Sequence, residues 1–207
     1  MNAPTPPAAG PRKSRRNNGR PAPRAPHPLL LTLHELHPGV FGPRAVPLKV
    51  GIFDELRAAH PEQLPAETLK AALGDHTRST RYLEAVASGL PRHGLDGQPV
   101  EPVAPEHVHH AILELHRRKG GSPQARERAL KQLVENIERS GLGRDGYRER
   151  FGQHPASQAL VDEALSFLAH KAARHEALSR AFQASGKSRE EFAEMYGLSP
   201  AEVATLA

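Results

Sequence analysis

The chain has 207 residues, with 28 basic and 23 acidic side chains, no cysteine, and no apolar run near the ~20 residues of a membrane helix. This composition excludes disulfides, thiolate metal sites and a cysteine nucleophile, and we expect a cytoplasmic protein with no membrane partner. The net charge of +5 is unevenly placed: residues 1–28 carry six basic and no acidic side chains, whereas residues 29–120 sum to −1 and residues 121–207 to 0.

Residues 1–28 are rich in Pro, Ala, Gly and Arg and contain almost no large apolar side chains. Such a segment cannot bury enough apolar surface to offset the entropy lost on ordering, so it is predicted to be a disordered basic tail. Because its charge is of one sign, we favour an arm that attracts phosphate groups. The alternative is a tail that only increases solubility.

Four helices are predicted between residues 29 and 90. The first spans residues 32–36 and the second runs from about residue 53 to 60. Pro65 suits the first position of a third helix, which is predicted to close at residues 74–76. Thr77 then occupies the position of an N-cap, which predicts a fourth helix that begins at Arg78 and ends before Ser88.

A β-hairpin is predicted around Asp96-Gly97, since this dipeptide favours a tight turn between strands. Pro105 begins a helix that places Val108, Ala111, Ile112 and Leu115 on its buried face. Gly120-Gly121 marks a hinge, and helices are predicted beyond it at about 124–140, 157–173 and 178–185, with two short ones at the end.

These patterns predict a mostly α protein with a small β component (α+β). A compact helical domain with a short β-hairpin is expected at residues 29–120, and a helical C-terminal extension at residues 121–207.

Four sequence motifs follow one another over about 75 residues. They are Pro47–Phe53 (PLKVGIF), Thr77–Leu83 (TRSTRYL), Arg92 with Leu95–Pro99 (LDGQP), and Glu106–Val108 with His110-Ala111. Together, in this order, they resemble the ProQ/FinO family of RNA-binding domains. The resemblance does not extend beyond Lys119.

The resemblance implies a compact, mostly helical domain that binds structured RNA. The RNA would be the base of a terminator-like hairpin and the single-stranded 3′ tail after it. The protein would be an RNA chaperone that acts by binding alone, on small RNAs and mRNA 3′ ends, in bacterial post-transcriptional regulation.

The motifs also imply which residues contact RNA. Lys49, Arg81 and Arg92 would be phosphate-facing cations, with Lys70 as a basic residue on the preceding helix. Thr77 and Ser79 would present a helix N-terminus to the RNA 3′ end. His76 stands where the family commonly has tyrosine. The complete expected set is Lys49, Lys70, His76, Thr77, Arg78, Ser79, Arg81, Tyr82 and Arg92.

The same residues suit RNA on physical grounds. A helix N-terminus has unpaired N–H groups and a partial positive charge, and Arg78 and Arg81 add charge beside it. Tyr82 offers a ring on which an unstacked base can lie, or else it is a core tyrosine. An arginine or lysine taken alone is most often solvated surface charge, so only the combination favours binding.

Two other functions, metal binding and catalysis, have little support in the sequence. His107, His109 and His110 could hold a metal, but a fourth ligand at diagnostic spacing is missing, so packing is the expected role. No catalytic motif is present, and we expect neither an enzyme nor a cofactor nor a small-molecule substrate. A monomer is expected.

The stretch Ser188–Val203 resembles a helix-turn-helix around Gly197, which gives the alternative function of a DNA-binding transcriptional regulator. Its second helix has no Arg, Lys, Asn or Gln to reach base edges. A helical hairpin without a DNA-reading role is therefore preferred.

Overall fold

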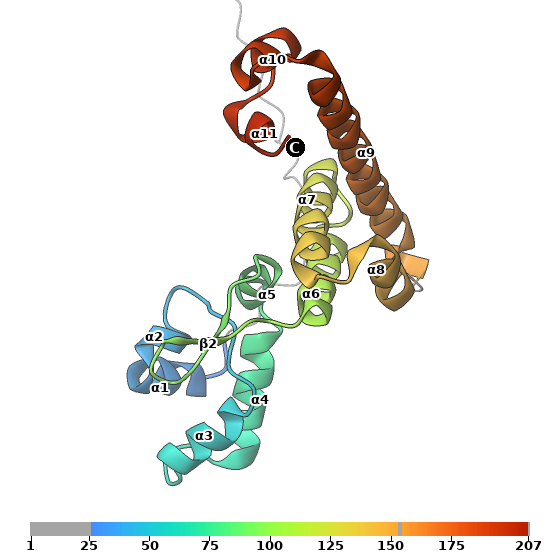
Figure 1. Cartoon of the computed structure of the whole chain (residues 1–207). Helices are drawn as coiled ribbons and strands as arrows, with labels where there is room; N and C mark the ends of the chain where they lie inside the picture. Colours follow the sequence, from blue (N-terminus) through green and yellow to red (C-terminus); the bar gives the residue numbers. More distant parts are fainter. Residues whose placement is uncertain (1–25, 153–154, 207) are drawn as a thin grey trace, which may run out of the picture.

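A computed structural model describes residues 26–152 and 155–206, and the tail predicted at residues 1–28 lies almost wholly outside this range. The described residues form helices and one two-stranded antiparallel hairpin, as predicted (Figure 1). The elements are α1 (Leu29–Leu36), α2 (Pro38–Phe41), α3 (Ile52–Ala59), α4 (Ala66–Thr77), α5 (Thr80–Ala87), β1 (Arg92–His93), β2 (Pro99–Glu101), α6 (Pro105–Arg118), α7 (Pro123–Ser140), α8 (Gly143–Phe151), α9 (Pro155–Ser185), α10 (Arg189–Tyr196) and α11 (Pro200–Ala204).

The boundary between α4 and α5 differs from the prediction. Helix α4 continues through Thr77, whose Oγ1 donates to the carbonyl oxygen of Leu73 at 2.8 Å, one turn earlier. The N-cap of α5 is Ser79, which has extended backbone angles (φ −65°, ψ 149°) and whose Oγ accepts from the Tyr82 N–H at 3.2 Å. A threonine hydroxyl bonds equally well to the preceding turn, so its presence did not fix the helix start.

The hairpin forms at the predicted turn. Gly97 has φ +75°, a left-handed conformation that side chains with a Cβ rarely adopt, so this turn favours glycine. The motif that begins at Pro47 runs beside β1. The Lys49 N–H donates to the carbonyl oxygen of His93 at 2.9 Å, and the His93 N–H donates to that of Pro47 at 2.7 Å.

A single cluster of buried side chains runs from α1 to α9. Helix α6 packs against α5 on one side and α7 on the other, and its four predicted core residues are buried (Figure 1). Ala129, Leu133 and Ile137 of α7 belong to this same cluster. Because this cluster is continuous across residue 120, it does not mark a domain boundary there. The predicted division of the chain at residue 120 stays a prediction.

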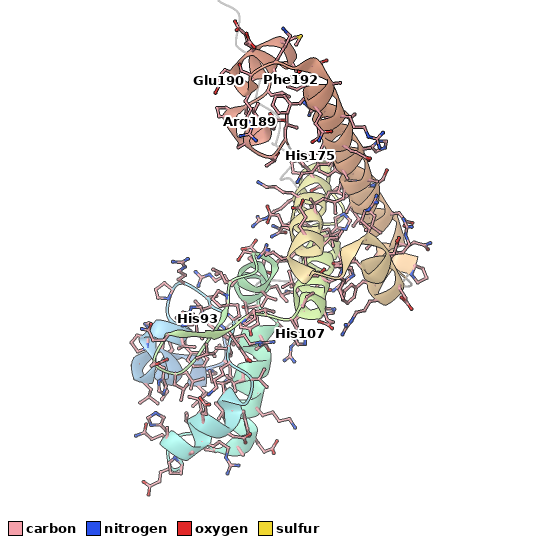
Figure 2. The ribbon with its side chains drawn as sticks, viewed as in Figure 1. His93, His107, His175, Arg189, Glu190 and Phe192 are labelled. Atoms are coloured by element: carbon pink, nitrogen blue, oxygen red, sulfur yellow. The ribbon has the colours of Figure 1, made fainter. Side chains whose placement is uncertain are left out.

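The extension differs from the prediction in two places. Helix α8 was not predicted, and α9 is one helix where two were expected. The expected break at residues 173–178 (ARHEAL) contains neither glycine nor proline, so nothing there ends a helix. As predicted, α10 and α11 form a helical hairpin around Gly197. Figure 2 shows Phe192 of α10 beside the end of α9, where it packs on Phe182.

Within the described ranges, every helix is either too short or too polar to cross a bilayer.

His109 has the packing role expected for this group of histidines. Its ring stacks on Phe151, and its Nδ1 lies 2.8 Å from the Tyr147 hydroxyl. Asn136 Nδ2 donates to the same hydroxyl at 2.9 Å and to the carbonyl oxygen of Pro105 at 3.1 Å. Burial lowers the pKa of His109 to about 4, which keeps the ring neutral at pH 7, and in the tautomer with Nδ1 unprotonated this atom can accept the Tyr147 O–H. The described residues contain no cluster of three potential metal ligands.

This low pKa predicts a loss of stability in mild acid. Unfolded His109 titrates near its ordinary pKa of 6.5, so between pH 6.5 and 4 the unfolded chain binds more protons than the folded one. The contribution is complete above pH 6.5 and is lost as the pH falls toward 4. It should amount to about 2 kcal/mol between pH 7.5 and 5.0.

The measurement is urea unfolding at these two pH values for the wild type and His109→Gln, whose amide oxygen can still accept from Tyr147. The variant should lose about 2 kcal/mol less than the wild type on acidification. An equal loss in both proteins would assign the acid sensitivity to other groups.

Candidate nucleic-acid interface

The turn between α4 and α5 presents an open helix N-terminus. Ser79 Oγ accepts the N–H of Tyr82, whereas the N–H groups of Thr80 and Arg81 donate to no group among the described residues. These two donors lie at the positive end of the helix dipole, which attracts anions. The site is therefore centred on residues 79–81, two residues later than predicted.

The His76 ring lies beside the N-terminus of α5. It packs edge-on between Phe41 and Tyr82, with centroids 5.2 and 5.4 Å away. Its Nε2 is buried and has no partner within the described parts of the chain. Burial lowers the pKa of His76, which keeps the ring neutral at pH 7. The imidazole thus retains a hydrogen-bonding atom that no side chain or backbone group uses.

Tyr82 and Arg92 have structural partners that the sequence did not reveal. The Tyr82 side chain is buried (8% exposed) and its hydroxyl accepts from the Leu48 N–H at 3.1 Å. Arg92 donates to the Leu48 carbonyl oxygen at 2.8 Å and to Nδ1 of His107 at 3.0 Å (Figure 2, where His107 lies at the start of α6). Of the two roles left open for Tyr82, the structure shows the core tyrosine, and Arg92, with 14% of its side chain exposed, is held by backbone and side-chain partners.

Two clefts flank the turn. The first, of about 460 Å³, lies between α5 and α6, and the second, of about 830 Å³, lies between the turn and α1. Four arginines and two carboxylates line them, a net charge of +2, whereas residues 29–120 as a whole sum to −1. The lining charges are Arg78, Arg81, Arg92, Arg118, Asp75 and Glu114.

The structure gathers seven of the nine predicted residues at these clefts. Thr77, Arg78, Tyr82 and Arg92 line the first cleft, and His76, Ser79 and Arg81 line the second.

The two lysines are not part of this group. Lys49 and Lys70 line neither cleft. Lys49 instead forms an ion pair with Glu55, whose hydrogen bond and charge raise the pKa of the Lys49 ammonium. Lys70 is exposed on α4.

Arg118 is the residue that the sequence reasoning missed. It lines both clefts, and its NH1 donates to the carbonyl oxygen of Arg78 at 2.7 Å, which braces the turn from α6. Its Nε donates to Glu114 at 2.8 Å. The basic run Arg117-Arg118-Lys119 at the end of the predicted helix is the signal that could have indicated it.

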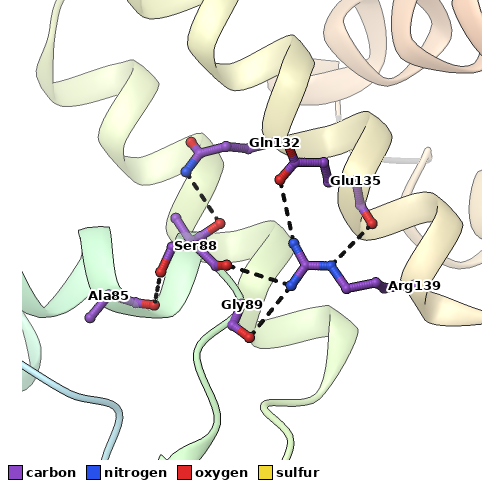
Figure 3. Close-up of polar contacts among 7 residues, drawn as sticks. Ala85, Ser88, Gly89, Gln132, Glu135 and Arg139 are labelled. Atoms are coloured by element: carbon purple, nitrogen blue, oxygen red, sulfur yellow. Dashed lines mark hydrogen bonds and ion pairs between the residues drawn. The ribbon is translucent and has the colours of Figure 1, made fainter. Parts of the chain in front are cut away.

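The opposite end of α5 is held by α7 (Figure 3). Gln132 Nε2 donates to the carbonyl oxygen of Ala87 at 3.2 Å, and Arg139 NH1 contacts those of Ser88 and Gly89 at 3.5 and 3.4 Å. A cation at this end also complements the helix dipole. The extension thereby fixes the helix whose N-terminus forms the site.

Comparison with known protein families matches residues 24–129, just over half of the chain, to the ProQ/FINO family. Among similar proteins, the RNA chaperone ProQ of Pseudoalteromonas atlantica is 40% identical over 77 residues, which cover 36% of each chain. RNA chaperone ProQ of Idiomarina loihiensis is 44% identical over 69 residues, covering 32% of this chain and 33% of the relative. The match thus spans about a third of each relative. The matched family segment contains all nine predicted contact residues, and the chain belongs to the ProQ/FinO family.

Proposed function

We propose that this protein is an RNA-binding chaperone that recognises terminator-like hairpins through their single-stranded 3′ tails and acts on small RNAs and mRNA 3′ ends by binding alone. The observation that carries this proposal is the unpaired N-terminus of α5 between two basic clefts. The name RNA chaperone, borne by the relatives, supports RNA as the partner.

The geometry suits the end of an RNA strand. The N–H groups of Thr80 and Arg81 can bind one phosphate, and the exposed Arg81 guanidinium can direct two parallel N–H groups at phosphate oxygens. A ribose hydroxyl, which DNA lacks at the 2′ position, can bond to the remaining donors at this N-terminus. An RNA strand that continued past the site in both directions would gain less binding energy from such a small cluster of donors.

The C-terminal hairpin provides no comparable support for DNA binding. Helix α11 has five residues, PAEVA, and none of them carries a donor suited to base edges. Ser199, at its N-cap, is engaged in a capping box with Glu202. Regulation of transcription through this hairpin is therefore not proposed.

Arg81→Ala tests the proposed site. The Arg81 side chain is exposed, and it makes no ion pair within residues 26–152 and 155–206, so its removal should leave thermal stability unchanged. Affinity for a tailed RNA hairpin should fall about tenfold, or ~1.4 kcal/mol. Fluorescence anisotropy with this RNA compares the affinities of the variant and the wild type. The same measurement with a DNA duplex of the same sequence compares DNA with RNA.

Lys131→Ala is the matched control, since Lys131 is exposed on α7 and lines neither cleft. It should bind RNA like the wild type. If Arg81→Ala and Lys131→Ala bind equally well, or if the wild type binds DNA and RNA alike, the N-terminus of α5 is not the recognition site.

A further inference from the structure

A third cleft adjoins the first on α6, and part of its wall lies beyond the family segment. It has a volume of about 660 Å³ and shares two lining residues, His110 and Glu114, with the first cleft. Arg117 of α6 forms part of its wall, and Arg150 and Phe151 of α8 form another part. Because α8 follows residue 129, this portion of the groove is built by the extension.

The groove remains basic where it reaches α8, since Arg117, Arg150 and Glu114 give the third cleft a net charge of +1. The third cleft adds Arg117 and Arg150 and no further carboxylate, so the net charge of the lining residues rises from +2 for two clefts to +4 for three. The extension as a whole has no net charge, so this excess is local. A positive stripe along a groove favours a polyanion that follows it.

Arg150 can exchange its carboxylate partner for an RNA phosphate. It forms an ion pair with Glu106 at the start of α6, and 56% of its side chain is exposed. Such solvent-exposed pairs contribute little to stability, so a phosphate can replace the carboxylate at small cost. The guanidinium also lies over the Phe151 ring, 5.8 Å from its centroid, which restricts its position.

We propose that the RNA-binding surface extends onto α8, where Arg150 binds a backbone phosphate of the nucleotides that precede the 3′ tail, while Arg117, paired with Glu114, completes the wall of the cleft. This inference rests on the proposed function, in which the N-terminus of α5 holds the tail's end. The extension then has two roles: it supports α5 through α7, and it lengthens the RNA footprint through α8.

The chain supplies a matched pair of arginines for the test. Arg148 is on the same helix, its side chain is 57% exposed, and it also has an ion pair, with Asp162 at 3.5 Å. It lines none of the three clefts. Arg150→Ala and Arg148→Ala therefore remove the same charge from similarly exposed, ion-paired positions, and differ in the cleft and its Phe151 contact.

The experiment titrates a tailed RNA hairpin against both variants over a range of salt concentrations. Arg150→Ala should weaken binding about fivefold and reduce the log–log salt slope by about 0.7–0.9, the value for one phosphate contact. Arg148→Ala should match the wild type. A short oligonucleotide of the tail alone should bind the wild type and both variants equally.

Glu106→Gln separates an RNA contact from a structural role of the ion pair. It breaks the same pair between α6 and α8 but frees Arg150, so it should tighten binding to the hairpin while Arg150→Ala weakens it. If both variants weaken binding, the ion pair acts through the fold and the inference is overturned. Equal effects of Arg150→Ala and Arg148→Ala would also overturn it.

Failure of this inference is distinguishable from failure of the proposed function. If Arg81→Ala weakens binding but Arg150→Ala behaves like Arg148→Ala, RNA is held at α5 and does not reach α8. If wild-type protein does not bind the tailed hairpin at all, the proposed function itself is contradicted.

Discussion

Replacing Tyr147 with alanine should lower the free energy of unfolding by about 3–5 kcal/mol, the typical loss for a large buried aromatic side chain. Tyr147 is fully buried on α8 and contacts Phe151, and its hydroxyl joins His109 of α6 to Asn136 of α7. The substitution leaves a cavity and also removes the partner of two buried polar groups. Urea unfolding at pH 7.5, followed by circular dichroism, measures the loss.

Tyr147→Phe separates the two contributions. It keeps the ring and removes only the hydroxyl, so it should cost about 1–3 kcal/mol through the unpaired His109 and Asn136 groups. Within the extension, Arg148→Ala serves as an exposed control with a change below about 0.5 kcal/mol. A Tyr147→Ala variant as stable as the wild type would mean that α8 does not belong to the core.

The sequence was sufficient to predict the elements of the family segment except α2, a four-residue helix at Pro38–Phe41. Their signals are local: Pro65 and Pro105 at helix starts, Asp96-Gly97 at the hairpin turn, and apolar spacing along α6. The start of α5 was misplaced by two residues because Thr77 and Ser79 are both acceptable caps by residue type. Only the backbone conformation distinguishes them, extended at Ser79 and helical at Thr77.

The roles of Tyr82 and Arg92 could not be predicted from local patterns. Both bind the backbone of Leu48, which lies 34 and 44 residues away in the sequence. These contacts depend on the tertiary arrangement that brings both α5 and the hairpin next to the segment around Leu48. Arg118 was missed for a similar reason, since its contact with the Arg78 carbonyl spans 40 residues.

The extension was less predictable because its helices have few large apolar residues. The middle of α9, residues 170–177, is exposed throughout and has no buried face to produce a periodic signal. Helix α8 contains two glycines, Gly143 and Gly146, and its one buried residue is Tyr147, so its pattern does not indicate a helix.

Loss of the free 3′ tail should weaken RNA binding at least about tenfold, or ~1.4 kcal/mol. The unpaired donors at Thr80 and Arg81 form a small fixed cluster, which fits one terminal ribose and its phosphate. The overall charge of residues 29–120 is −1, so attraction to the bulk domain cannot substitute for this contact. Selectivity among RNAs must then come from contacts with the 3′ end of the strand.

The direct test is a titration of wild-type protein with one terminator hairpin in four forms: its natural 3′ tail, a trimmed tail, a 3′-phosphorylated end, and the same stem and tail as DNA. The tailed RNA should bind at least about tenfold more tightly than each of the other three. Equal affinity for all four would show a polyanion binder without recognition of the RNA end, and would contradict the site at the N-terminus of α5.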